Sequence, residues 1–178
     1  MNILISGGCK NGKSSLAERT AAAMARGGPL YYLATMLPRD DEDRARVRRH
    51  VASRAGKGFE TVERGRDILR ALEETDPSGT FLLDSVTALL ANEMFPAGGP
   101  DPGAPARVTS ELLAFAARAG NAVFVADFIF SDAEDYDPLT EAYRRGLADV
   151  CRALAARCDA VADVCAGEAI LFKGALTL

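Results

Sequence analysis

Residues 7–14 read Gly7-Gly8-Cys9-Lys10-Asn11-Gly12-Lys13-Ser14 and match the pattern G-x-x-x-x-G-K-[ST]. An apolar run at residues 3–5 precedes this stretch, and an alanine-rich segment with helical spacing follows it. In that context a glycine-rich loop curls so that backbone N–H groups and the next helix N-terminus point at phosphate oxygens. Lys13 is then expected to reach the β- and γ-phosphates and the Ser14 hydroxyl to bind Mg²⁺. The stretch therefore predicts a nucleoside triphosphate site, and the alternative is a strand-to-helix turn that binds nothing.

Short apolar runs alternate with amphipathic stretches along the rest of the chain, which is typical of β-α units around a largely parallel sheet. We therefore expect an α/β P-loop NTPase fold whose mostly parallel central sheet is flanked by helices. The expected strands cover residues 2–6, 30–34, 80–84, 122–126 and 160–165, with a further candidate at 169–173. The expected helices cover residues 13–26, 41–54, 65–75, 86–95, 105–119 and 138–157.

Length and composition favour one nucleotide-binding domain over residues 1–178, because 178 residues at 48% hydrophobic can bury a sizeable core. Residues 96–105 are rich in proline and glycine, so we expect a flexible surface loop inside this domain. The net charge of −4 argues against a protein that coats nucleic acid. No run approaches the roughly 18 apolar residues of a membrane span, and Met1 leads directly into an expected strand. These features predict a cytoplasmic protein.

The four cysteines lack the close C-x-x-C pairs that zinc sites use. We interpret Cys151, Cys158 and Cys165 as ordinary packing residues. Cys9 differs, because the helix N-terminus beside the phosphate loop can lower the pKa of a thiol there and make it reactive.

Asp84 is the expected acid of the second nucleotide motif, because it closes the apolar run at residues 81–83. The carboxyl ends of parallel strands line one edge of a sheet, so Asp84 should emerge near the phosphate loop and help to hold Mg²⁺. The alternative is that Asp84 only opens a turn before the next helix.

The only histidine, His50, lies in an expected helix that begins acidic and continues basic. Arg46, His50 and Arg54 are spaced by four residues, so these positions share one side of a helix. Guanidinium groups suit phosphate oxygens, and positive neighbours lower a histidine pKa and keep the imidazole neutral and nucleophilic. Such an imidazole can attack an α-phosphate. The alternative is a solvated helix on which the histidine has no chemical role.

Several anchors in chain order make the whole sequence similar to the bifunctional adenosylcobinamide kinase/adenosylcobinamide-phosphate guanylyltransferase family of cobalamin biosynthesis. After the phosphate loop come Tyr32-Leu33-Ala34-Thr35 and the basic segment 45–50 with Arg54. Residues 59–63 follow, and then residues 82–87 with Asn92. Many family members carry Asn-Glu-Val-Gly near residue 127, where this chain instead reads Val-Ala-Asp-Phe-Ile-Phe-Ser-Asp over 125–132. Asp127 is the acid nearest that strand end.

The resemblance implies a RecA-like P-loop fold and two successive reactions. An NTP, either ATP or GTP, phosphorylates a corrinoid hydroxyl, and GMP then passes from GTP through His50 to the new phosphate. It also implies Mg²⁺, a small-molecule corrinoid substrate, no nucleic-acid partner and a homo-oligomer, expected to be a trimer. Beyond the phosphate loop, the residues that match the family's nucleotide-contacting positions are Thr35, Met36, Leu37, Val51, Ala52, Ser53, Arg54, Glu63 and Asp84.

Two other functions remain open from the residues. A small-molecule kinase would use the same phosphate loop without nucleotidyl transfer. A regulatory or assembly protein would use bound nucleotide as a switch, although the guanine-reading Asn-Lys-x-Asp sequence of regulatory GTPases is absent from the chain.

Overall fold

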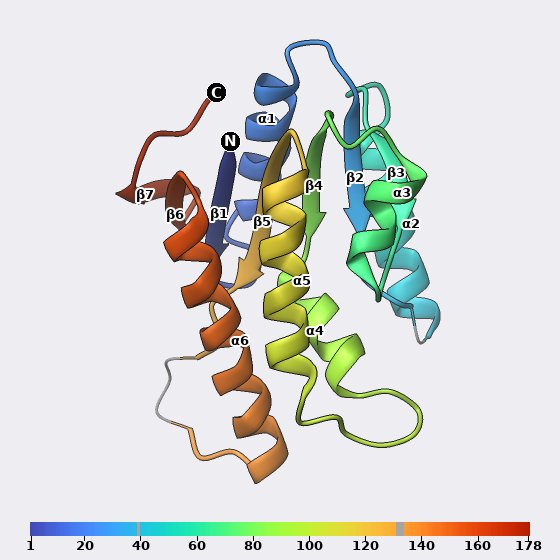
Figure 1. Cartoon of the computed structure of the whole chain (residues 1–178), viewed down its shortest axis with the longest axis vertical. Helices are drawn as coiled ribbons and strands as arrows, with labels where there is room; N and C mark the ends of the chain where they lie inside the picture. The colour runs from blue at the N-terminus through green and yellow to red at the C-terminus, as the bar shows by residue number, and fades with distance from the viewer. Residues whose placement is uncertain (39, 131–133) are drawn as a thin grey trace.

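The computed structural model describes all residues except 39 and 131–133, and these described residues form one seven-stranded sheet (Figure 1). The side chains of Asp43, Arg46, Arg49, His50 and Ser53 also lie outside the description. Strand order is β3-β2-β4-β5-β1-β6-β7, and all neighbours are parallel except the antiparallel β6–β7 pair. The strands are β1 (Asn2–Gly7), β2 (Leu30–Ala34), β3 (Glu60–Glu63), β4 (Thr80–Asp84), β5 (Asn121–Asp127), β6 (Ala160–Cys165) and β7 (Glu168–Lys173).

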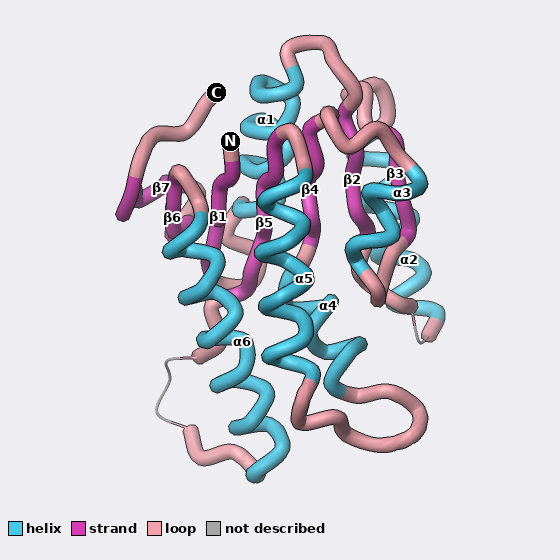
Figure 2. The backbone as a smooth tube through the Cα atoms, in the orientation of Figure 1, coloured by secondary structure: helices cyan, strands magenta, loops and turns pink. Residues whose placement is uncertain are grey.

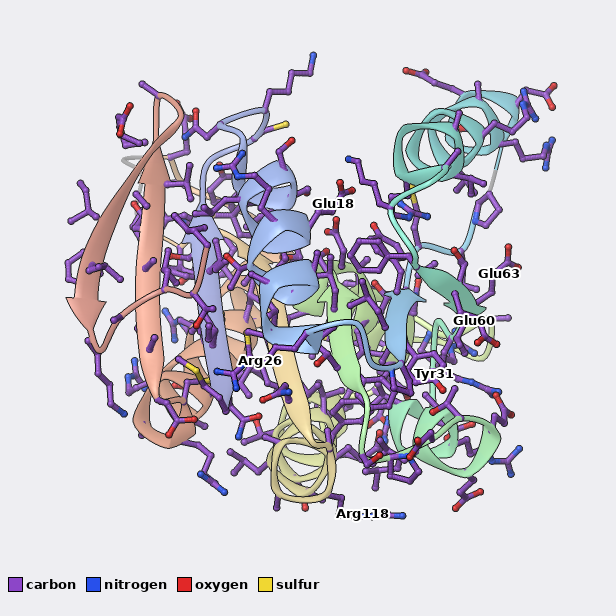
Figure 3. All side chains as sticks on the ribbon, turned by 90° about the horizontal axis from the view of Figure 1, so that it is seen from above. Glu18, Arg26, Tyr31, Glu60, Glu63 and Arg118 are labelled. Carbon is purple, nitrogen blue, oxygen red and sulfur yellow. The ribbon has the colours of Figure 1, made fainter. Side chains whose placement is uncertain are left out.

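Helices cover both faces of this sheet, as Figure 3 shows in a view from above. On one face lie α1 (Lys13–Ala25) and α2 (Asp41–Arg54). The other face carries the 3-10 turn η1 (Ile68–Arg70), α3 (Ala71–Glu74), α4 (Val86–Met94), α5 (Ala104–Arg118) and α6 (Pro138–Arg157). Figure 2 shows the loops gathering at the two ends of the strands. Among the described residues, no helix combines the length and apolar character needed to cross a bilayer.

The two faces of the sheet build separate hydrophobic cores. Ile3, Ile5 and Val125 pack against Leu16 and Ala17 of α1. On the opposite face, the larger core contains aromatic residues such as Phe81, Phe115 and Phe124. The central strands are apolar on both sides because helices cover both sides. This burial makes β1, β4 and β5 a rigid base for the loops at their carboxyl ends.

The expected elements are found, with three corrections. β3 was not expected, because Glu60-Thr61-Val62-Glu63 is a short, mostly exposed edge strand without an apolar run. The helix expected over 65–75 is reduced to η1 and α3, since Asp67 adopts a left-handed conformation and interrupts it. The loop expected over 96–105 is shorter, because Ala104 and Pro105 already form the first turn of α5. Proline suits that position, where its missing N–H is not needed.

Candidate functional site

The phosphate loop joins β1 to α1 through positions that require glycine. A Cβ on Gly7 would lie 2.7 Å from the Val164 carbonyl oxygen of the neighbouring β6. Gly12 caps α1 with a φ of 92°, in the left-handed region where a side chain is strained. Asn11 Nδ2 donates to the same Val164 carbonyl at 3.2 Å. These contacts brace the loop against β6 and leave it curled at the N-terminus of α1.

Lys13 lies folded over this loop. Its ammonium donates to the Gly8 carbonyl at 3.1 Å and forms an ion pair with Asp127 Oδ1 at 2.7 Å. Asp127 is the last residue of β5, which is hydrogen-bonded to β1 with Gly7 opposite Asp127. The charged end of Lys13 is therefore held between the loop and the carboxyl end of β5.

Asp84 ends β4, on the far side of β5 from β1. Its Oδ2 accepts a hydrogen bond from the Tyr32 hydroxyl at 2.9 Å. Burial and the nearby Asp84 charge raise the pKa of Tyr32 well above its usual range, so the hydroxyl stays a neutral donor. Asp84 thus reaches the same edge of the sheet as the phosphate loop, as the strand-end position predicted.

Arg54 is a buried cation at the C-terminal end of α2. The residue is 5% exposed, and its guanidinium carbon lies 3.4 Å from the centroid of the Tyr32 ring. Within the described part of the chain, its buried Nε and Nη1 atoms have no hydrogen-bond partner. A buried guanidinium without an acceptor is costly, and an anionic ligand would supply acceptors for it.

A pocket of about 510 Å³ is lined by Arg54, Asp84 and Asp127, and the described residues that line it include none of the phosphate-loop residues 7–14. It reaches from the side chains of α2 to Asp127, the partner of Lys13. Of the residues predicted from the sequence, the pocket brings together Met36, Leu37, Val51, Arg54, Glu63 and Asp84. Further lining residues include Tyr32, Arg64, Thr87, Asp127 and Tyr143.

Other predicted residues lie differently. Thr35 is fully buried, and its hydroxyl both donates to the Ser85 carbonyl and accepts from the Ser85 N–H. Ala52 is exposed on α2. His50 and Ser53 belong to α2, but their side chains lie outside the described residues.

Asn92, on α4, supports the loops that border the pocket. Its buried Nδ2 donates to the Thr35 carbonyl at 2.7 Å and to the Gly65 carbonyl at 3.0 Å. These two carbonyls follow β2 and β3, so one side chain ties together the segments that carry Met36 and Arg64.

Sequence reasoning did not select Asp127 or Tyr32 as site residues. A signal for Asp127 was present, since this acid closes the apolar run at 122–126 as Asp84 closes 81–83. Tyr32 had no such signal, because its hydroxyl meets Asp84 only after β2 and β4 pair in the sheet.

Comparison with known protein families identifies the family of the chain. The family described as cobinamide kinase/cobinamide phosphate guanyltransferase matches residues 3–171. No curated protein matches the chain.

Among solved structures, one ATPase domain is similar with a TM-score of 0.59 at 10% identity, over 97% of this chain and 76% of that one. The flagellar accessory protein FlaH from Methanocaldococcus jannaschii is also similar, with a TM-score of 0.45 at 14% identity, over 97% of this chain and 78% of that chain. The first likeness confirms the expected P-loop NTPase fold. Because the family match spans nearly the whole chain, this nucleotide-binding transferase belongs to the cobinamide kinase/cobinamide phosphate guanyltransferase family of cobalamin biosynthesis.

Proposed function

We propose that the chain carries out its family's two reactions at this one pocket, with His50 as the group that accepts GMP from GTP. The observation that carries the proposal is the position of Arg54. Arg54 lines the pocket that also reaches Asp127, the partner of Lys13, and its buried Nε and Nη1 have no hydrogen-bond partner among the described residues. His50 precedes Arg54 by four residues on α2, so the two positions share one side of that helix.

The proposed guanylyl transfer has two displacement steps. A neutral His50 nitrogen attacks the α-phosphorus of GTP, and the bond from that phosphorus to the bridging oxygen breaks and releases pyrophosphate. A phosphate oxygen of cobinamide phosphate then attacks the same phosphorus, which returns His50 to its starting state. Arg54 and Lys13 would stabilise the negative charge on the phosphate oxygens during both steps. Glu63, at the pocket wall, is proposed to contact the nucleotide.

The residues at the loop also fit Mg²⁺. Ser14 lies in the first turn of α1, and Asp84 offers a carboxylate whose Oδ2 already accepts the Tyr32 hydroxyl. Hydroxyl and carboxylate oxygens are the ligands Mg²⁺ prefers, and phosphate oxygens complete its shell. We propose that Ser14 and Asp84 hold the ion, which when bound would neutralise charge on the triphosphate.

The identity of the nucleotide used in each reaction and the cellular location are also proposals. GTP supplies GMP, whereas ATP or GTP supplies the phosphoryl group, and a cytoplasmic location would provide both nucleotides.

We further propose a homo-oligomer, a trimer as the family resemblance implies, in which the edge strand β7 contacts a second copy. Ile170 and Phe172 of β7 are large apolar side chains exposed to solvent.

The test is incubation with GTP labelled in the α-phosphate. We expect a protein-bound label that is stable in alkali and lost in acid, and that is absent from a His50→Asn variant. Arg152→Ala, at an exposed position on α6, is the matched control and should label like the unmodified protein. Labelling that persists in His50→Asn would contradict the proposal, as would no labelling of the unmodified protein.

A further inference from the structure

We propose that Asp127 is the catalytic base of the phosphorylation reaction and takes the proton from the corrinoid hydroxyl as it attacks the γ-phosphate. This inference rests on the proposed function in one respect, namely that phosphorylation occurs at the pocket described above. It assigns a role to a residue that the family's nucleotide-contacting positions do not include.

The topology brings Asp127 to the centre of the site. β5 lies between β1, which leads into the phosphate loop, and β4, which ends at Asp84. Asp127 is opposite Gly7 in the pairing of β1 with β5, and the next residue, Phe128, donates its N–H to the Gly7 carbonyl at 3.0 Å. The backbone N–H of Asp127 donates to Thr87 Oγ1 at 2.8 Å. Asp127 is therefore fixed on both sides, next to the start of the phosphate loop.

The distance to Lys13 places the carboxylate within reach of an attacking hydroxyl. Asp127 Oδ1 lies 2.7 Å from Lys13 Nζ, and a phosphate oxygen bound by an ammonium lies about 2.8 Å from it. The carboxylate and a bound γ-phosphate are then on the order of 6 Å apart or less. That separation leaves room for one hydroxyl oxygen, about 3 Å from the phosphorus and about 3 Å from the base.

The carboxylate is also accessible from the side where a hydroxyl would enter. The side chain of Asp127 is 31% exposed, and Asp127 lines the pocket together with Thr87 and Tyr143. Tyr143 itself is held by its hydroxyl, which donates to the Thr87 carbonyl at 2.9 Å. The acceptor hydroxyl can thus approach Asp127 through the pocket while the nucleotide occupies the phosphate loop.

Asp84 is less suited to this role. One of its oxygens accepts the Tyr32 hydroxyl, and its strand is separated from β1 by β5. The two acids therefore have different proposed roles. Asp84 would help to hold Mg²⁺, and Asp127 would accept the proton of the corrinoid hydroxyl.

The step balances without a further reactant. The bond from the hydroxyl oxygen to the γ-phosphorus forms while the bond from that phosphorus to the β,γ-bridging oxygen breaks. The hydroxyl proton passes to Asp127, the nucleoside diphosphate leaves with the bridging oxygen, and the proton is then released to water. Lys13 remains paired with the phosphates and orients the carboxylate.

The experiment measures three reactions of the full chain for Asp127→Asn. These are γ-phosphoryl transfer from NTP to cobinamide, labelling of the protein by α-labelled GTP, and GMP transfer to supplied cobinamide phosphate. We expect the first to fall about 100- to 10,000-fold, as loss of a general base does, while the other two stay within about threefold. Asp127→Glu, which keeps a carboxylate, should recover part of the first rate. Asp149→Asn, at an exposed position on α6, is the control and should change none of them.

Two outcomes would overturn the inference. A phosphorylation rate within about tenfold of the unmodified protein would show that Asp127 takes no proton. Equal loss of all three reactions would show that it only supports Lys13 and the nucleotide site. Neither outcome depends on His50. If the His50 proposal failed, α-labelled GTP would not label the unmodified protein, but phosphorylation of cobinamide would still occur.

Discussion

The guanidinium of Arg54 stacks on the ring of Tyr32, with its central carbon 3.4 Å from the ring centroid. The Tyr32 hydroxyl in turn donates to Asp84. Three side chains from α2, β2 and β4 therefore link the C-terminal end of the His50 helix to the edge of the sheet. A cation against an aromatic ring contributes about 2 kcal/mol when both are desolvated. This contact uses the face of the guanidinium and connects α2 to β2.

Replacing Arg54 by alanine should weaken GTP binding by roughly 10- to 100-fold. The reason is the loss of charge-assisted hydrogen bonds, which are worth about 1.5–3 kcal/mol. Titration calorimetry with GTP measures the change. Arg54→Lys should recover only part of the affinity, because an ammonium lacks the planar fork that matches phosphate and stacks on tyrosine. Arg152→Ala serves as the exposed control, and an unchanged dissociation constant for Arg54→Ala would remove Arg54 from the site.

A second link joins α1 to the segment that follows α2. Lys57 donates to Glu18 Oε2 at 2.6 Å, and the Glu18 side chain is 8% exposed whereas that of Lys57 is 49% exposed. Figure 3 shows Glu18 on α1, directed toward the space between α1 and α2. Lys57→Met leaves a buried carboxylate without its partner. Because Lys57 is half exposed, we expect a loss of about 1–2 kcal/mol, less than for a fully buried pair.

Urea denaturation gives this loss as a shift in the midpoint. The double variant Glu18→Gln/Lys57→Met should be more stable than Lys57→Met, since it removes the unpaired charge. Arg152→Met breaks an exposed pair with Asp149 and should cost less than about 1 kcal/mol. Equal costs for Lys57→Met and Arg152→Met would mean that the Glu18 pair stabilises nothing beyond a surface contact.

The fold and part of the site could be predicted from the sequence because their signals are local. Gly7, Gly12 and Lys13 appear at a fixed spacing after an apolar run, and Asp84 closes another such run. The strand pattern then predicts that these strand ends share one edge. Helical spacing of apolar residues was also sufficient to predict α5 and α6, each of which has a proline near its N-terminus.

The rest could not be predicted because it depends on strand order. Nothing in the sequence says that β5 lies between β1 and β4, and that order alone brings Asp127 to Lys13. The stack of Arg54 on Tyr32 forms only when α2 packs against β2 in the folded protein. β3 had no signal, because a four-residue edge strand buries too little to need an apolar pattern.

Asn92→Ala should both destabilise the protein and loosen the pocket. It removes the donor shared by the Thr35 and Gly65 carbonyls and leaves them buried without it. An unsatisfied buried acceptor costs about 1–3 kcal/mol, so the urea midpoint should fall and GTP affinity should drop with it. Asn92→Asp should be worse, because a carboxylate would face two carbonyl oxygens. If the aspartate variant were the more stable of the two, these hydrogen bonds would not be the source of the effect.

If the proposed contact through β7 forms, Phe172→Lys should shift the chain from the proposed oligomer to monomer in sedimentation velocity. Phe172 is 71% exposed on the edge strand β7, where a lysine opposes strand-to-strand association. Leu139→Lys, at the exposed start of α6, is the control and should leave the oligomer intact. An oligomer unaffected by Phe172→Lys would place the contact elsewhere.

Stability should fall as the pH rises above about 9, in part through two buried thiols. Burial, and then the charge of Asp127, raises the pKa of Cys151 from 9.0 to about 12. Burial, and then Asp159, raises the pKa of Cys158 from 9.0 to about 12. In the unfolded chain both thiols ionise near 9, so between about pH 9 and 12 the unfolded state binds fewer protons than the folded state. The free energy of unfolding therefore decreases across this interval, and the thiol contribution is fully present only below about pH 9.

Urea midpoints measured on both sides of about pH 9 check this expectation. Tyrosines and lysines also titrate in this range, so the control is the double variant Cys151→Ala/Cys158→Ala, which keeps those groups and should show a shallower decline. Identical slopes for the two proteins would contradict the assignment.

The burial of Cys151 and Cys158 also predicts that a maleimide at neutral pH labels the exposed Cys9 and Cys165 but reaches the two buried thiols only after unfolding. Because Cys9 lies in the phosphate loop, added GTP should slow its labelling and leave that of Cys165 unchanged.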